Sequence, residues 1–190
     1  MEALLVSIGL VALAEIGDKT QLLSLALAAK YRRPLPILSG IAVATLLNHA
    51  LAGALGTWLT ELVGPRLLQG LVGASFLAMA GWMLVPDKPS ALGQPARLGV
   101  FLASAVAFFV VEMGDKTQIA TVALAARYDA FYQVVGGTTL GMLVANAPVV
   151  LLGERIVGRV PVRTVQRCTA VLFALLGAVV LYQAWSSARA

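Results

Sequence analysis

The sequence predicts an all-α integral membrane protein, with six transmembrane helices arranged as two inverted three-helix repeats. Three observations lead to this prediction. Hydrophobic residues make up 59% of the 190 residues and charged residues only 12%, whereas soluble domains carry about 25% charged residues. The apolar residues fall into six long segments. One charged motif occurs twice, in the first and in the fourth segment.

Composition excludes several classes of protein. A bilayer span needs about 20 apolar residues, so six spans use nearly the whole chain and leave no length for a soluble catalytic domain. A mean hydropathy of +0.88 argues against disorder, a collagen-like fibre and an ordinary cytosolic enzyme. The single cysteine, Cys168, excludes an internal disulfide. No cleavable signal peptide is expected, because Met1 and Glu2 precede the first apolar stretch without a basic region.

The first three segments cover residues 3–29, 35–59 and 67–85. The first ends at a basic turn that contains Lys30, Arg32, Arg33 and Pro34. The second is interrupted by two polar residues, Asn48 and His49, and the third stops before Pro86. A polar linker containing proline and glycine follows over residues 86–97.

The last three segments cover residues 98–126, 131–152 and 162–185. Asn146 and Pro148 lie inside the fifth. Within the apolar segments, charge clusters occur only in the first and the fourth, near the middle of each. We therefore expect both clusters at the depth of the bilayer midplane.

The two clusters are copies of each other. Glu15-Ile-Gly-Asp-Lys-Thr-Gln21 and Glu112-Met-Gly-Asp-Lys-Thr-Gln118 are separated by 97 residues, and eleven of seventeen positions are identical between 15–31 and 112–128. The chain is therefore predicted to be a duplication, with a first repeat at 1–85, a cytoplasmic linker at 86–97 and a second repeat at 98–190. Because each repeat has three spans, the second is inverted relative to the first, as in many transporters.

Basic residues predict the orientation. Nine lie on one predicted side and three on the other, besides the two lysines inside the segments. The positive-inside rule makes the richer side cytoplasmic and places both termini outside. It also explains the net charge of +5 without nucleic acid as a partner. The nine are Lys30, Arg32, Arg33, Lys88, Arg97, Arg155, Arg159, Arg163 and Arg167, and the three are Arg66, Arg127 and Arg189.

The duplicated motif predicts a metal site between the repeats. Six ionisable groups inside hydrocarbon are costly unless they face each other, water or an ion. Their oxygens suit hard divalent cations such as Mn²⁺, Ca²⁺ or Mg²⁺. Four carboxylates and two lysines leave a charge of −2, and without a cation the clustered carboxylates should take up protons. This competition is a physical basis for cation/proton antiport. The predicted ligands are Glu15, Asp18, Gln21, Glu112, Asp115 and Gln118.

The other motif residues are assigned supporting roles. Gly17 permits a break in the helix, and Gly114 is its equivalent. Lys19 and Lys116 either pair with carboxylates or move during transport. Thr20 and Thr117 are interpreted as helix-packing hydroxyls, as are Ser24 and Thr121.

Three polar residues lie outside the motifs. His49, the single histidine, is interpreted as a hydrogen-bonded interior group, with a proton relay as the alternative. Asn48 and Asn146 are expected at contacts between helices.

The paired Glu-x-Gly-Asp-Lys-Thr motifs, at Glu15–Thr20 and Glu112–Thr117, resemble those of the Gdt-type family of cation/proton exchangers. The resemblance covers essentially the whole chain, and the short linker is similar to that of the bacterial manganese exporters. It implies a transporter in the bacterial inner membrane that exports Mn²⁺, and in some members Ca²⁺, in exchange for protons. The metal is then the substrate, and no permanently bound cofactor is expected.

Two other functions remain open at this point. An exporter of small organic cations is disfavoured by the two motif lysines. An intramembrane hydrolase is disfavoured because catalysis assigns unlike roles to its groups, whereas the motifs are nearly identical. The expected partners are divalent cations, protons and the lipid bilayer; a homo-oligomer is compatible with the sequence, which does not fix the oligomeric state.

Overall fold

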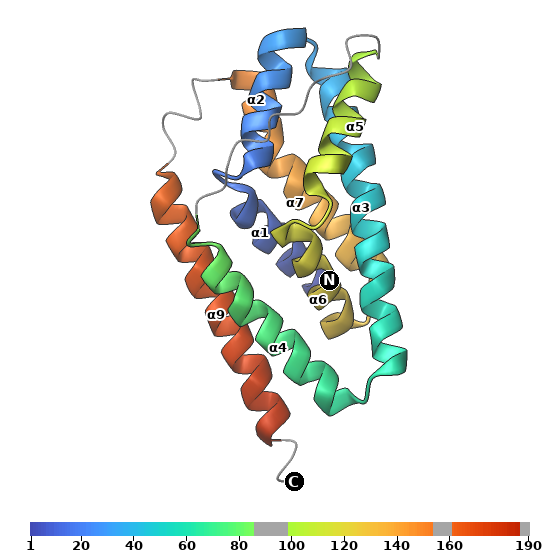
Figure 1. The fold of residues 1–190 in the computed structure, drawn as a ribbon, viewed down its shortest axis with the longest axis vertical. Coiled ribbons are helices and arrows are strands. Elements are labelled where there is room, and N and C mark those ends of the chain that lie inside the picture. Colours follow the sequence, from blue (N-terminus) through green and yellow to red (C-terminus); the bar gives the residue numbers. More distant parts are fainter. Residues whose placement is uncertain (86–98, 154–160, 187–190) are drawn as a thin grey trace.

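A computed structural model describes residues 1–85, 99–153 and 161–186. These residues form eight helices and no strand (Figure 1). The helices are α1 (Glu2–Glu15), α2 (Lys19–Tyr31), α3 (Pro34–Leu62), α4 (Pro65–Trp82), α5 (Val100–Glu112), α6 (Lys116–Tyr128), α7 (Phe131–Leu152) and α9 (Val162–Ser186). The predicted linker at 86–97, with Lys88 and Arg97, lies outside the described residues, and so do three further arginines of the count: Arg155, Arg159 and Arg189.

Two of the six expected segments are each divided into two helices. Segment 3–29 contains α1 and α2, and segment 98–126 contains α5 and α6. Within the described residues, three helices are by themselves long and apolar enough to cross a membrane: α3, α7 and α9. The fold is therefore all-helical and typical of a membrane protein, but two of its expected spans are interrupted halfway.

A glycine at each interruption explains why the helix stops there. Gly17 has a φ of 80° and Gly114 a φ of 78°, values in the left-handed region that residues with a Cβ rarely adopt. The residues before them, Ile16 and Met113, are extended. The second helix then restarts after Asp18 or Asp115, which occupy the N-cap positions of α2 and α6. The same backbone turn thus occurs in both copies of the motif.

Equivalent helices make equivalent contacts in the two halves. Helix α1 packs along α7, α5 packs along α3, and α4 pairs with α9 (Figure 1). Small residues allow the first two contacts to be close. A Cβ added at Gly40 would lie 2.7 Å from the carbonyl oxygen of Phe101, and one added at Gly137 would lie 2.7 Å from that of Leu4. These two contacts are related by the same offset of 97 residues.

The contact between α4 and α9 also relates equivalent positions. The rings of Phe76 and Phe173, which are 97 residues apart, have centroids 6.0 Å from each other. Both side chains are fully buried. Each of these two residues therefore packs against its own equivalent in the other half.

The distribution of polarity is opposite to that of a soluble protein. Large apolar side chains cover the outside of the helices, among them Leu35, Leu51, Leu151 and Val171, each more than half exposed. The interior contains four carboxylates and a lysine that are at most 2% exposed. An apolar exterior of this extent suits lipid rather than water.

The two motif glycines offer a matched test of the fold. In each Gly→Ala variant the free energy of unfolding should fall by about 1–2 kcal/mol, because alanine is strained at positive φ. A Cβ at Gly17 would also overlap with Val162 Cγ1, whereas one at Gly114 meets nothing within 4 Å. Gly17→Ala should therefore lose about a further 1–3 kcal/mol through overpacking.

Thermal unfolding of the protein in detergent measures this difference. Adding Val162→Ala to Gly17→Ala should restore stability to the level of Gly114→Ala. Equal stability of the two single variants would show that Val162 does not press on the first motif.

Candidate metal centre

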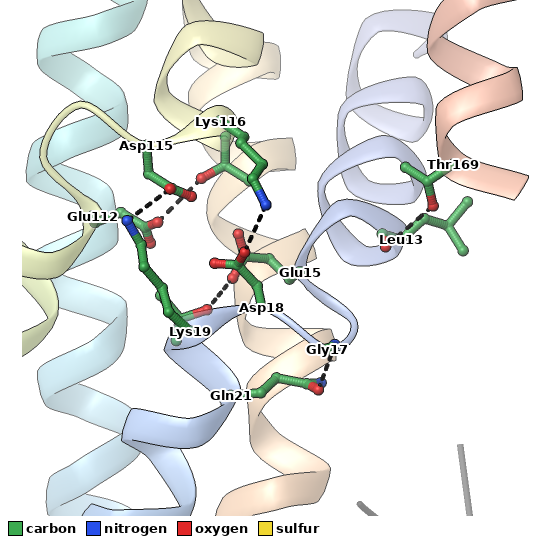
Figure 2. Close-up of polar contacts among 12 residues, drawn as sticks. Leu13, Glu15, Gly17, Asp18, Lys19, Gln21, Glu112, Asp115, Lys116 and Thr169 are labelled. Atoms are coloured by element: carbon green, nitrogen blue, oxygen red, sulfur yellow. Dashed lines mark hydrogen bonds and ion pairs between the residues drawn. The ribbon is translucent and has the colours of Figure 1, made fainter. Parts of the chain in front are cut away.

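The interruptions in α1–α2 and α5–α6 bring the two motifs together in the interior (Figure 2). Glu15 ends α1 and Asp18 caps α2, while Glu112 ends α5 and Asp115 caps α6. The four carboxylates are 0–2% exposed. Because the N-terminus of a helix carries partial positive charge, the starts of α2 and α6 favour anionic groups there.

The motif glutamines hold the interrupted backbone in place. The side-chain oxygen of Gln21 accepts a hydrogen bond from the Gly17 N–H at 2.9 Å, and that of Gln118 accepts one from the Gly114 N–H at 2.6 Å. These bonds satisfy amide groups that the helix break leaves without an intrahelical partner. The side-chain nitrogen of Gln21 also donates to the carbonyl oxygen of Ala145 on α7.

Two ion pairs cross between the halves in an exchanged pattern (Figure 2). Lys19 Nζ lies 2.7 Å from Asp115 Oδ1, and Lys116 Nζ lies 3.1 Å from Asp18 Oδ1. Each motif therefore supplies the lysine that neutralises an aspartate of the other motif. The pairs differ in burial, because the Lys116 side chain is 2% exposed and that of Lys19 is 19% exposed.

The motif glutamates receive hydrogen bonds from threonines of their own motif. Thr20 Oγ1 donates to Glu15 Oε2, and Thr117 Oγ1 donates to Glu112 Oε1 at 3.2 Å. The sequence interpretation of these threonines as packing hydroxyls missed this role. The spacing of five residues across a helix break, repeated in both motifs, is the signal that could have identified it.

Three carboxylates form the group best suited to a cation. Glu15, Glu112 and Asp115 each offer an oxygen, and these oxygens lie within 4.8 Å of one another. Each of the three also has one buried oxygen without a hydrogen-bond partner among the described residues: Glu15 Oε1, Glu112 Oε2 and Asp115 Oδ2. Buried acceptors of this kind are costly unless something positive reaches them, and hard divalent cations prefer such oxygens.

The other predicted ligands have different surroundings. Asp18 is paired with Lys116 and lies outside the group of three. The side-chain oxygens of Gln21 and Gln118 are engaged by the glycine N–H groups. The structure thus brings three of the six predicted ligands together. The other three contact other groups: Asp18 contacts Lys116, and the two glutamines contact the glycine N–H groups.

Both asparagines contact a neighbouring helix, as expected. Asn48 Nδ2 donates to the carbonyl oxygen of Phe109 on α5 at 3.0 Å. Asn146 Oδ1 accepts a hydrogen bond from Ser24 on α2 at 2.7 Å. His49 differs from expectation, because it is fully buried but neither ring nitrogen has a hydrogen-bond partner within the described part of the chain.

A cavity reaches the site from one side. It has a volume of ≈ 340 Å³ and lies between α1, α2, α7 and the start of α9. Its wall is apolar apart from two polar side chains, Asp18 and Gln21. The two halves therefore differ around their motifs, since Val162 stands against Gly17 while the space beside Gly114 is open.

Comparison with known proteins identifies the family. The profile described as "Divalent cation/proton antiporter GDT1" matches the chain twice, over residues 3–91 and over residues 100–188. The chain belongs to the GDT1 family. Each match contains one copy of the motif. Because the family is one of cation transporters, this GDT1 protein is a transporter rather than an enzyme. No solved structure matches the chain significantly.

Relatives of this GDT1 protein are found in bacteria and in eukaryotes. A protein of Vibrio cholerae named "Putative manganese exporter" is 52% identical, covering 93% of this chain and 88% of its own. A GDT1-like protein of Synechocystis is 30% identical, covering 90% of this chain and 92% of its own. The "Divalent cation/proton antiporter GDT1" of Saccharomyces cerevisiae is 22% identical, covering 98% and 86%.

The unequal burial of the two ion pairs predicts unequal effects of Asp→Asn substitutions in metal-free protein. Asp18→Asn removes the negative charge that pairs with Lys116, whose side chain is 2% exposed. The substitution should lower the free energy of unfolding by about 3–5 kcal/mol. Asp115→Asn should cost less, because Lys19 at 19% exposure retains contact with water.

Denaturant unfolding in detergent provides the measurement. The double variant Asp18→Asn/Lys116→Met removes both charges and should recover part of the loss of Asp18→Asn. A double variant less stable than that single variant would contradict the charge-pair explanation.

Proposed function

We propose that this GDT1 protein exports Mn²⁺ from the cytoplasm in exchange for protons. The observation that carries the proposal is the group of three buried carboxylates from both motifs, Glu15, Glu112 and Asp115, whose oxygens lie within 4.8 Å. Only oxygen ligands are present in this group, which favours Mn²⁺, Ca²⁺ or Mg²⁺ over softer metals. The name of the Vibrio cholerae relative favours Mn²⁺ among them.

We infer that proton coupling follows from the charge of the site. With all groups ionised, four carboxylates and two lysines carry a charge of −2, which one divalent cation neutralises. When the cation leaves, the carboxylates remain close together in an apolar interior, where like charges are costly. Protonation of the carboxylates relieves the same repulsion. Cation and protons therefore occupy the site alternately, which is the condition for an antiporter.

The proposed arrangement in the membrane is two inverted repeats, 1–85 and 98–190, joined by a cytoplasmic linker at 86–97. Each interrupted helix pair, α1–α2 and α5–α6, serves as one span, which gives six spans with α3, α4, α7 and α9. Discontinuous helices that meet at a midplane substrate site are typical of transporters with this architecture. The contacts related by the 97-residue offset support the repeats.

Basic residues support the proposed orientation in the cytoplasmic membrane, with both termini outside. Arg32 and Arg33 lie between α2 and α3, and Arg163 and Arg167 lie near the start of α9. At the other end of the helices, α4 begins beside Arg66. In this orientation the cavity beside Asp18 lies next to the end of α7 and the start of α9, on the side assigned to the cytoplasm. We infer that the exported cation enters the site through it.

The other predicted ligands and the two motif lysines also have roles in the proposed exchange. Asp18 becomes available to the cation when Lys116 moves away from it. The Asp115 oxygen that pairs with Lys19 becomes available in addition to the other when Lys19 moves away. Gln21 and Gln118 support the site through the glycine loops, with their second lone pairs still available as ligands. This gives Lys19 and Lys116 the role of internal cations that occupy the aspartates in the metal-free state.

Glu15→Gln and Glu112→Gln should each abolish metal transport, because each removes one ligand charge and one site for a proton. The measurement is Mn²⁺ and Ca²⁺ flux into or out of proteoliposomes with an imposed pH gradient. Glu61→Gln is the matched control, since Glu61 is an exposed glutamate at the end of α3 and its loss should leave flux unchanged.

Three outcomes separate the candidate functions. Gradient-driven Mn²⁺ flux that is lost in both site variants supports the proposal. Near-normal flux in both variants contradicts the assignment of the site. Wild-type protein that is folded but moves neither metal, while exporting an organic amine, would favour the organic-cation exporter.

A further inference from the structure

A proline inside α7 removes one hydrogen-bond donor from the helix beside the cavity. Pro148 lies in the interior of this helix, which runs from Phe131 to Leu152. Proline has no backbone N–H, so the carbonyl oxygen of Val144, four residues earlier, cannot accept the hydrogen bond that another residue at 148 would donate. The proline ring also pushes this carbonyl away from its helical position. An oxygen in this situation needs another donor, a water or an ion to reach it.

The geometry of the helix places this oxygen at the cavity wall. A carbonyl oxygen of an α-helix points toward the residue four positions later, so it lies between the two residues on the helix surface. Val144 and Pro148 both line the cavity of ≈ 340 Å³. The Val144 oxygen therefore lies between two lining residues. Backbone groups without a helical partner are tolerated at membrane depth where they line a cavity of this kind.

The neighbouring carbonyl shows that this face of α7 is turned toward α2. The oxygen of Ala145 accepts a hydrogen bond from Gln21 Nε2 at 3.0 Å. Gln21 lines the same cavity, and so does Asp18, a carboxylate of the first motif. The cavity thus combines a backbone carbonyl, an amide and a carboxylate, while its other lining side chains are apolar.

The other half of the chain has no equivalent proline. The residue 97 positions before Pro148 is Leu51, which keeps its backbone N–H, and it lies inside α3. The equivalent of Val144 is Leu47, whose carbonyl oxygen therefore has a donor four residues later. The missing donor is found only in the half whose cavity lies on the side assigned to the cytoplasm.

We propose that the Val144 carbonyl oxygen and the side-chain oxygen of Gln21 form an entry subsite for the divalent cation, next to Asp18. From this subsite the cation reaches Asp18 by taking the place of Lys116. Backbone carbonyl, amide and carboxylate oxygens are all ligands of hard divalent cations, and carbonyls of interrupted helices coordinate cations in other transporters. The inference rests on the proposed export of a divalent cation, because it assigns that cation a first position in the protein.

The subsite lowers the cost of bringing a hydrated ion into an apolar cavity. A cation that leaves water needs oxygen atoms to replace its hydration shell, as rings of carbonyls do in ion channels. The side chains of the cavity wall offer few such atoms, and the Val144 oxygen adds one from the backbone. Neutral oxygens attract the cation less strongly than the central group of three carboxylates. The cation therefore moves on to that group instead of remaining at the entrance.

Pro148→Ala tests the subsite, because alanine restores the N–H that the Val144 oxygen lacks. Mn²⁺ transport driven by a pH gradient is measured in everted membrane vesicles, whose cytoplasmic face is outside, and in right-side-out vesicles. For the cytoplasmic face, we expect the Mn²⁺ concentration for half-maximal transport to rise about 10-fold, the lower end of the effect of losing a group that supports a metal site. The maximal rate and the half-maximal concentration for the opposite face should stay at the wild-type values.

The matched control replaces Pro148 by lactic acid, the α-hydroxy acid counterpart of alanine, through nonsense suppression. This variant also lacks the proline ring, but it has an ester oxygen in place of the N–H, so the Val144 oxygen still has no helical donor. Its half-maximal concentration should equal that of the wild type. Pro34→Ala should also change nothing, because Pro34 is the first residue of α3 and its missing N–H frees no carbonyl inside a helix.

The outcomes separate the subsite from the proposed function. A rise confined to the cytoplasmic face in Pro148→Ala, and absent from the lactic acid variant, supports the subsite. An unchanged concentration in folded Pro148→Ala protein overturns it, as does an equal rise in the lactic acid variant or an equal rise on both faces. Pro148→Leu, with the residue of the equivalent position, replaces Pro148→Ala if thermal unfolding shows that the alanine variant does not fold. Wild-type protein without gradient-driven Mn²⁺ transport would instead overturn the exchanger itself.

Discussion

The balance of charge in the apolar interior is the constraint on which the rest of the structure depends. Four carboxylates that are 0–2% exposed cannot remain in hydrocarbon without positive charge nearby. Two lysines supply part of it, each across the boundary between the halves. Both ion pairs cross between the two halves. The residual negative charge is what a divalent cation or protons would neutralise in the proposed function. In the proposed function, stability and transport therefore depend on the same side chains.

The interrupted helices follow from this constraint. In a continuous helix, Glu15 and Asp18 would project from the same face, and the backbone groups between them would be hydrogen-bonded within the helix. The turn at Gly17 instead ends one helix at Glu15 and starts another after Asp18. The side-chain oxygen of Gln21 accepts the hydrogen bond of the Gly17 N–H, which the interruption leaves without a partner in the helix. The same device in the second half places Glu112 and Asp115 opposite. Small residues such as Gly40 then let the helices approach closely enough to enclose the charges.

The sequence predicts that the motif carboxylates meet in the interior, and the reason is physical. Charges inside apolar segments are so costly that they must meet, and Gly17 and Gly114 mark the breaks that allow it. Side-chain partners are less predictable, because they depend on rotamers and on differences between the halves. The exchanged pairing of Lys19 and Lys116, the threonine hydrogen bonds and the isolation of His49 follow from packing. The exact helix bounds around the breaks were not predicted either, because residues 3–29 and 98–126 were each interpreted as one segment, whereas the structure divides each into two helices.

The number of cations that one chain binds tests the central account most directly, because a site built from both motifs is a single site. Titration of the purified protein with Mn²⁺, followed by electron paramagnetic resonance of free and bound metal, gives this number. The account predicts one Mn²⁺ per chain in an environment of oxygen ligands, with protons released to the medium as it binds. Two equivalent ions per chain, or binding without proton release, would contradict it.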